Sequence, residues 1–126
     1  MIVTFRKAKK IMRIALRESD GITIFDISGE ICRSHVAATT LHPMIKSQVE
    51  QGRRKVLLNL ENVEFVDSFG IGELLASYIS IQNSGGRLKL ASISPRLLLV
   101  FQVTQLTRVL DIQDDEEKAL ASFSKS

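Results

Sequence analysis

The feature that most constrains the fold is an apolar run at positions 56–60. In an extended strand, the sequence Val56-Leu57-Leu58-Asn59-Leu60 places apolar side chains on both faces. Such a run predicts a central strand of a sheet that is covered by helices. The chain has 126 residues, which is the size of one compact domain. We therefore expect a single α/β domain built around this strand.

The residues before the central strand predict a hairpin and a helix. Alternating segments at 12–17 and 22–27, with turn residues between them, are typical of two antiparallel strands. The periodicity over 34–51 predicts a helix, in which Pro43 marks a break or a second start.

The residues after the central strand continue the alternation of helices and strands. The expected elements are a helix at 69–82, a strand at 87–93, a helix from Pro95 to about Val103, an edge strand at 109–112 and a last helix. Asp114 is expected to cap that last helix, with Glu117 at the reciprocal capping position and Ala119, Leu120 and Phe123 facing inward. The order predicts a mixed sheet of four to five strands with about four helices.

The charge of the chain is unevenly distributed. The net charge is +3 and the pI about 9.2, yet five of the 17 basic residues fall within the first thirteen positions, where there is no acid. Residues 14–126 carry 12 basic and 14 acidic side chains, a net charge of −2. We therefore expect a basic N-terminal extension at 1–11 and a domain at 12–126 that binds no nucleic acid directly.

The single cysteine and the lack of a long apolar run are features from which the cellular compartment of the protein can be predicted. Cys32 has no second cysteine with which to form an internal disulfide, which is typical of a reducing compartment. No apolar run approaches the roughly 20 residues that cross a bilayer. We expect a cytoplasmic protein without membrane insertion.

The candidate functional segment is 58–75, which reads as a buried strand, a short loop and a helix. Asp67-Ser68 stands at the junction, where ligands and functional groups of open α/β sheets tend to lie. Ser68 is expected at or beside the N-cap, with its hydroxyl accepting a backbone N–H. Gly70 and Gly72 remove side chains beside it, so that another backbone or a partner can come close. The same residues also fit an ordinary helix cap followed by packing glycines.

Enzyme motifs are incomplete in this segment. The Gly-x-Gly at 70–72 lacks both the third glycine of a dinucleotide site and the Gly-Lys of a phosphate loop. The alternative of a small hydrolase that uses Ser68 as its nucleophile is supported only by half of a nucleophile-elbow motif, which lacks its first glycine. The two histidines, His35 and His42, lie on another expected helix, where we expect them to flank a solvated face rather than form a triad or metal site. We expect no catalytic residues, no metal and no cofactor.

Residues from about 12 to 123 resemble a STAS domain (sulphate transporter and anti-sigma factor antagonist), and in particular the bacterial anti-sigma factor antagonists. The motifs that carry the resemblance, in chain order, are Ser28-Gly29-Glu30-Ile31, Leu58 through Phe65, Val66-Asp67-Ser68-Phe69-Gly70-Ile71-Gly72, Gly85-Gly86, and Ile93-Ser94-Pro95 followed by Phe101. Each motif is weak alone, but their order over most of the chain is specific.

The resemblance implies a protein–protein switch with no catalytic activity. The unphosphorylated protein would bind an anti-sigma factor, which is a serine kinase, and free the sigma factor; phosphorylation of Ser68 would end that binding. The residues implied to contact the partner are Glu30, Asp67, Ser68, Phe69, Gly70, Ile71 and Gly72. Whether the protein is a monomer or a dimer stays open.

Three departures from the family pattern leave an alternative open. Phe69 stands where serine, threonine or alanine is usual, Cys32-Arg33 replaces the usual aspartate, and Thr104-Gln105-Leu106 replaces Ser/Thr-Gly-Leu. An exposed Phe69 ring would be an apolar contact for a partner, and an inward ring would be part of the core; we favour the exposed ring, because the apolar stripe of its helix begins later. Its presence motivates the alternative of a constitutive STAS subunit in a signalling scaffold or a lipid-transport ATPase complex.

Overall fold

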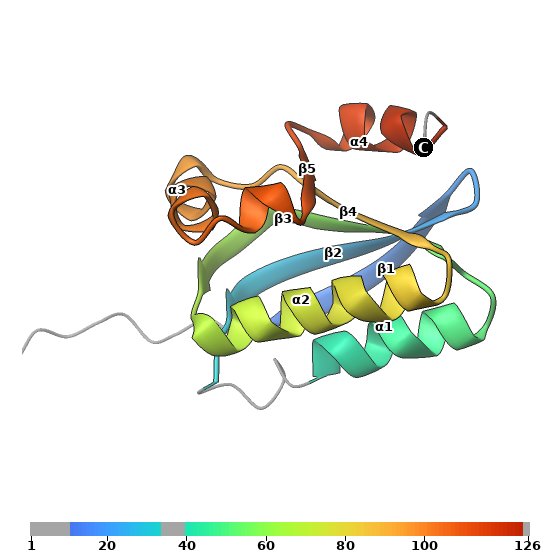
Figure 1. Ribbon diagram of the computed structural model, residues 1–126, viewed down its shortest axis with the longest axis horizontal. Helices are drawn as coiled ribbons and strands as arrows, with labels where there is room; N and C mark the ends of the chain where they lie inside the picture. The colour runs from blue at the N-terminus through green and yellow to red at the C-terminus, as the bar shows by residue number, and fades with distance from the viewer. Residues whose placement is uncertain (1–10, 34–39, 125–126) are drawn as a thin grey trace, which may run out of the picture.

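A computed structural model describes residues 11–33 and 40–124, which form one mixed sheet and four α-helices (Figure 1). The strands are β1 (Arg13–Ser19), β2 (Ile22–Ile31), β3 (Lys55–Val66), β4 (Arg87–Ala91) and β5 (Asp111–Gln113). The helices are α1 (Leu41–Glu50), α2 (Ser68–Asn83), α3 (Pro95–Val103), the short 3₁₀ helix η2 (Leu106–Arg108) and α4 (Glu116–Phe123). The predicted α/β fold, with four to five strands and about four helices, is confirmed.

The sheet has the strand order β1-β2-β3-β4-β5. β1 and β2 form the expected antiparallel hairpin, and the three remaining pairs are parallel. Consequently β2, β3 and β4 end at the same edge of the sheet. The start of α2 and the whole of α3 lie at this carboxyl end (Figure 1).

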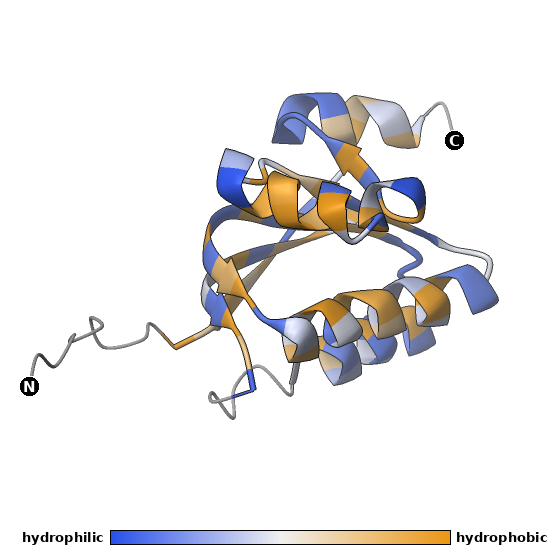
Figure 2. Ribbon diagram, turned by 60° about the vertical axis from the view of Figure 1, so that its left-hand side comes forward, coloured by the Kyte–Doolittle hydropathy of each residue, from blue (hydrophilic) through white to orange (hydrophobic). Residues whose placement is uncertain are grey.

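Both faces of β3 are buried, as the apolar run predicts. Leu58 and Phe25 belong to the main core, which α1 and α2 cover, whereas Leu57 belongs to a smaller core beneath α4. In α4, Ala119 and Phe123 are buried against this second face. Figure 2 shows α4 on the opposite side of the sheet from α1 and α2. The central position of β3 follows directly from the absence of a polar face.

The structure corrects several element boundaries. β3 extends to Val66, well beyond the predicted residues 56–60, and β4 ends at Ala91. The described helix α1 begins at Leu41, so Pro43 lies in its first turn, where its missing N–H costs nothing; residues 34–39 of the predicted helix lie outside the described residues.

The expected cap of the last helix is wrong by one residue. Asp115, not Asp114, is the N-cap of α4, and its carboxylate accepts a hydrogen bond from the Lys118 N–H at 2.8 Å. Glu117 therefore does not occupy the reciprocal position, because the third residue after Asp115 is Lys118. Asp114 instead pairs with the Lys118 side chain at 3.2 Å. Asp114 and Asp115 are adjacent and both suit an N-cap, so the local sequence does not distinguish them. The packing of α4 on the sheet determines which of the two is the cap.

An ion-pair cluster attaches α4 to the hairpin. The Arg17 guanidinium bridges Asp26 on β2 and Glu116 on α4, with a distance of 2.8 Å from Arg17 Nη2 to Asp26 Oδ1. Asn59 Nδ2 donates a further hydrogen bond to Asp26 at 2.8 Å. The hydrogen bond from Arg17 lowers the pKa of Asp26 below its ordinary value, burial opposes this, and the bond from Asn59 adds to the lowering.

We expect Asp26→Asn to lower the free energy of unfolding by about 0.5–1 kcal/mol at neutral pH, as for other partly exposed pairs. Because the pKa of Asp26 is depressed in the folded state, its contribution is complete above the unfolded value of about 3.9 and disappears as the pH falls through the folded value. Urea unfolding at pH 7 and at several values below pH 4 should show the difference from wild type shrinking. Asp114→Asn, in an exposed pair, is the control and should change little.

Candidate functional site

The junction between β3 and α2 is organised by the carboxylate of Asp67. Asp67 is the N-cap of α2, and its Oδ1 accepts a hydrogen bond from the Gly70 N–H at 2.9 Å. Its Oδ2 accepts one from the Arg33 N–H, also at 2.9 Å, while the Asp67 N–H donates to the Ile31 carbonyl at 3.3 Å. One side chain therefore ties the exit from β2 to the first turn of α2.

These bonds also determine the charge of Asp67. Burial works to raise the pKa of the carboxyl, but the backbone N–H bonds from Arg33, Gly70 and Phe69 outweigh it and hold the pKa below its ordinary value. Asp67 is therefore an anion at neutral pH. A negative charge stands permanently next to Ser68.

Ser68 is the first residue of α2 and is exposed. The prediction that it lies at or beside the N-cap is confirmed, but the expectation that its hydroxyl is the capping acceptor is wrong, because Asp67 has that role. The Ser68 hydroxyl is thus not needed for the cap. It lies at the positive end of a 16-residue helix, where a negative group is electrostatically favoured.

The two glycines of the site have different roles. A Cβ on Gly70 would lie 2.2 Å from the Ile31 carbonyl oxygen and 2.7 Å from Val66 Cγ1, so Gly70 permits close packing of α2 on the end of β2. A Cβ on Gly72 would meet nothing within 4 Å, and Gly72 is exposed. Of the two glycines that the sequence analysis offered as packing residues, only Gly70 therefore has that role. Gly72 leaves open surface one turn beyond Ser68.

Phe69 and Ile71 lie between the exposed positions and face the protein. Both are half-buried and pack against the main core. The expectation of an exposed Phe69 ring is therefore wrong in its main part. The ring packs on the core and only its remaining accessible part borders Ser68.

Glu30 is not on the exposed surface of this site. It is 8% exposed, near the end of β2, with its Oε1 3.9 Å from the Cys32 Sγ. Of the seven predicted contact residues, the structure thus exposes Ser68 and Gly72, half-buries Asp67, Phe69 and Ile71, and buries Glu30 and Gly70.

The structure adds contacts that the sequence did not indicate. The hydrogen bond from the Arg33 N–H to Asp67 joins residues 34 positions apart, and the local sequence does not indicate which backbone N–H groups bond to Asp67. His42 Nε2 lies 2.7 Å from the Ser80 Oγ, and Glu73 accepts from the His42 N–H at 3.0 Å, which links α1 to α2. The expected solvated position is thus wrong for the half-buried His42, and His35 lies outside the described residues.

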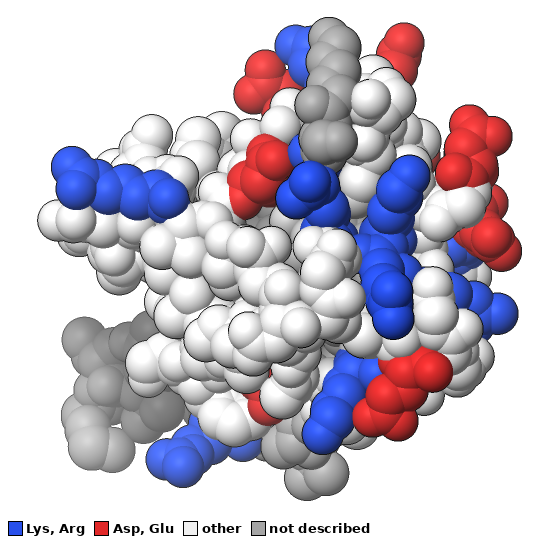
Figure 3. All heavy atoms as spheres, turned by 45° about the vertical axis from the view of Figure 1, so that its right-hand side comes forward, with Lys and Arg blue, Asp and Glu red and all other residues white. Residues whose placement is uncertain are grey.

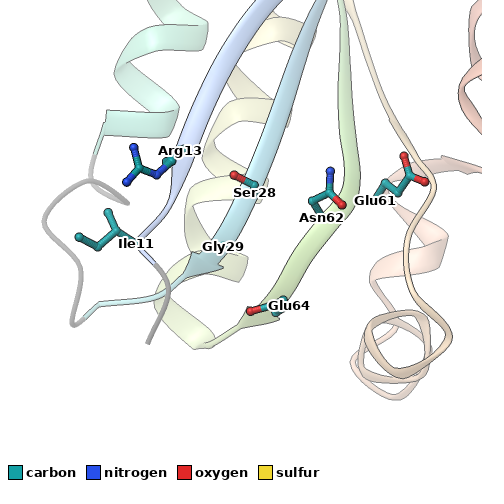
Figure 4. A pocket seen from close by; sticks show the side chains of 7 residues that line it. All are labelled: Ile11, Arg13, Ser28, Gly29, Glu61, Asn62 and Glu64. Atoms are coloured by element: carbon teal, nitrogen blue, oxygen red, sulfur yellow. The ribbon is translucent and has the colours of Figure 1, made fainter. Parts of the chain in front are cut away.

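A shallow cavity of about 600 Å³ lies at the ends of β2 and β3, with α2 behind the strands (Figure 4). Its lining is Ile11, Arg13, Ser28, Gly29, Glu61, Asn62 and Glu64. The lining mixes one cation with two carboxylates, so it does not define a single ligand charge. Within residues 11–33 and 40–124, no group of three His, Cys, Asp or Glu side chains could hold a metal ion.

The fold and the capped junction correspond to a known class of protein domain. The family model described as STAS domain matches residues 13–119. The chain therefore belongs to the STAS domain family, as the sequence motifs predict. Among the helices of the described residues, none is both long and apolar enough to cross a membrane.

Within that family, the chain is similar to anti-sigma factor antagonists. It is 24% identical over 113 residues to the anti-sigma F factor antagonist of Paenibacillus polymyxa, covering 89% of this chain and 95% of the relative. It is 27% identical over 106 residues to the anti-sigma-B factor antagonist of Bacillus subtilis (strain 168), covering 84% and 94%.

Two solved structures, one of an unphosphorylated and one of a phosphorylated protein, share this fold. The anti-sigma factor antagonist SpoIIAA in its unphosphorylated form matches with a TM-score of 0.68 at 22% identity, covering 90% of this chain and 99% of that one. The Bacillus SpoIIAA in the phosphorylated form matches with a TM-score of 0.67 at 24% identity, covering 88% and 99%. The fold described here is thus similar to both forms.

Proposed function

We propose that the protein is a cytoplasmic anti-sigma factor antagonist whose partner is an anti-sigma factor with serine kinase activity. In its unphosphorylated form it binds this partner and releases the sigma factor. Phosphorylation of Ser68 ends the binding. The observation that carries the proposal is an exposed serine, free of the capping role, at the start of α2 and next to an ionised aspartate.

The geometry supports a switch that acts without refolding. A phosphate on Ser68 adds nearly two negative charges, and the positive end of the helix dipole tolerates such a group. The cap made by Asp67 does not use the serine hydroxyl, so modification leaves it intact. Agreement of the fold with both forms of SpoIIAA is consistent with this view.

The partner surface that we propose is centred on Ser68 and Gly72. Asp67, Phe69 and Ile71 contribute their accessible parts, while Gly70 and Glu30 support the surface from within. A partner can approach Gly72 closely, because no side chain covers the backbone there. The alternative of a constitutive subunit was motivated by the presence of Phe69, whose ring packs against the main core.

We expect one phosphate to be transferred to Ser68. The test incubates the purified chain with ATP, magnesium and the purified anti-sigma factor kinase encoded in the same genome, and measures the intact mass. Ser68→Ala should abolish the increase in mass, because it removes the acceptor hydroxyl. Ser47→Ala, at an exposed serine on α1, should leave it unchanged. An unmodified wild-type chain beside a kinase that is active on itself or on another substrate would contradict the proposal.

A further inference from the structure

Exposed apolar side chains are concentrated on and just after α3. Among the described residues, seven large hydrophobic side chains are exposed, and four of them lie within eleven positions: Leu99, Val100, Val103 and Val109. We call these four residues the α3 surface. Leu99 is 59% and Val103 75% exposed. Scattered exposed apolar residues need no explanation, but a group of neighbours marks an interaction site.

The α3 surface is not needed for the core of this chain. Leu97 and Phe101 face inward from the same helix and are buried in the main core, so α3 is already anchored. Its outward side is apolar as well, and Figure 2 shows strongly hydrophobic helical ribbon on this part of the molecule. On the outer side of this nine-residue helix, Leu99 and Val103 are largely exposed and are not among the residues that pack in the two cores.

The charge around the α3 surface indicates the chemistry of what covers it. Residues 95–110 contain Arg96 and Arg108, both exposed, and no acidic residue, but Asp111 lines a pocket with Val109, and Asp114 lines another with Leu98 and Thr107. Helix α2 contributes a single charged residue, Glu73. Figure 3 shows a broad uncharged area on one face of the molecule, with both Lys or Arg and Asp or Glu side chains around it. Arg96 is the only charged residue of α3 itself, so an occupant that meets the outer side of α3 with apolar side chains and a carboxylate edge is complementary to this helix.

Two other occupants fit less well. Pairing of α3 with α3 of a second copy would bring Arg96 and Arg108 toward the same arginines of that copy, with no acid in 95–110 to offset them. An anionic membrane attracts a protein by about 1 kcal/mol for each basic residue near its surface, which is little for two arginines.

We infer that the α3 surface is a second contact site for the proposed anti-sigma factor, and that it receives an apolar patch edged by carboxylates. The inference rests on the proposed function. Because α3 and the start of α2 lie at the same end of the sheet (Figure 1), one partner can cover both. The phosphate on Ser68 acts on the α2 part only, so the α3 surface contributes to affinity separately from the switch.

Val103→Asp should weaken binding of the unphosphorylated chain to the purified kinase about tenfold or more, as for removal of a central apolar contact. Val103→Lys should weaken it less, because a cation suits a partner edged by carboxylates. Leu16→Asp is the matched control: Leu16 is 45% exposed on β1, and its variant should bind like wild type. Thermal unfolding checks that each variant is folded, and calorimetry measures the affinity.

The possible outcomes separate the two proposals. The second contact site is overturned if Val103→Asp binds the kinase with wild-type affinity, or if Val103→Lys lowers the affinity more than Val103→Asp does. Either result leaves the proposed function standing. No binding of the wild-type chain to an active kinase overturns the proposed function itself, and with it this inference. If the wild-type chain binds phosphatidylglycerol vesicles and Val103→Asp abolishes that binding, the surface is assigned to a membrane. If the wild-type chain forms a dimer in sedimentation and Val103→Asp abolishes the dimer, the surface is assigned to a second copy.

Discussion

Phosphorylated Ser68 is expected to weaken binding to the anti-sigma factor at least about 100-fold, which corresponds to roughly 2.7 kcal/mol. The added charge stands next to the ionised Asp67, and both must lose water when a partner covers this surface. Calorimetry of the phosphorylated and unphosphorylated protein with a non-hydrolysable ATP analogue measures the difference. Added salt should reduce part of it, because it screens the repulsion at an exposed site.

The same modification should leave the fold unchanged. We expect the urea midpoint of the phosphorylated protein to equal or slightly exceed that of the unmodified one, because an anion at a helix N-terminus is stabilising by about 0.3–1 kcal/mol. Ser68→Ala provides the control for loss of the hydroxyl and should retain binding. Equal affinity of both forms, or a phosphorylated protein that unfolds, would contradict the local block that we describe.

Gly70→Ala is expected to destabilise the protein by about 1–3 kcal/mol or more, the range for forced overpacking. The new Cβ would lie 2.2 Å from the Ile31 carbonyl oxygen, which is backbone and cannot swing aside. Gly72→Ala should instead raise stability by about 0.5–1 kcal/mol, because alanine is the better helix former and no atom lies within 4 Å. Urea unfolding of the two variants measures the contrast.

The Gly72 variant also tests the partner surface. If a partner approaches the bare backbone at Gly72, then Gly72→Ala should weaken kinase binding even though the chain is more stable. Gly72→Glu should weaken it further. A stabilised Gly72→Ala chain that binds like wild type would remove Gly72 from the contact surface, and equal destabilisation by both alanine variants would contradict the distinction between the two glycines.

Much of the fold follows from local patterns in the sequence. The apolar run at 56–60 predicts a buried central strand, and the alternation at 22–27 predicts its neighbour in the hairpin. These predictions succeed because strand and helix periodicities involve residues close in the chain. The boundaries were less predictable: β3 continues to Val66 through polar residues, because pairing with β2 holds it extended.

The sequence indicated the candidate site, but it did not indicate the structural role of each residue there. Asp67-Ser68 at a strand–helix junction and the STAS motifs are visible in the sequence. Which of Asp67 and Ser68 is the cap depended on where the end of β2 lies, since Arg33 also donates to Asp67. The close approach of α2 to the end of β2 makes Gly70 a packing residue, because a Cβ there would lie 2.2 Å from the Ile31 carbonyl oxygen, and Phe69 packs against the main core.

The sequence by itself thus determined the α/β class, the central strand, the family motifs and the position of the candidate serine. Only the tertiary structure decided which side chains are accessible: it buries Glu30, opens the backbone at Gly72 and leaves Leu99 and Val103 outside. The physical reason is that periodicity specifies which residues share a face of a helix or strand. Whether another segment covers that face depends on contacts between residues far apart in the chain.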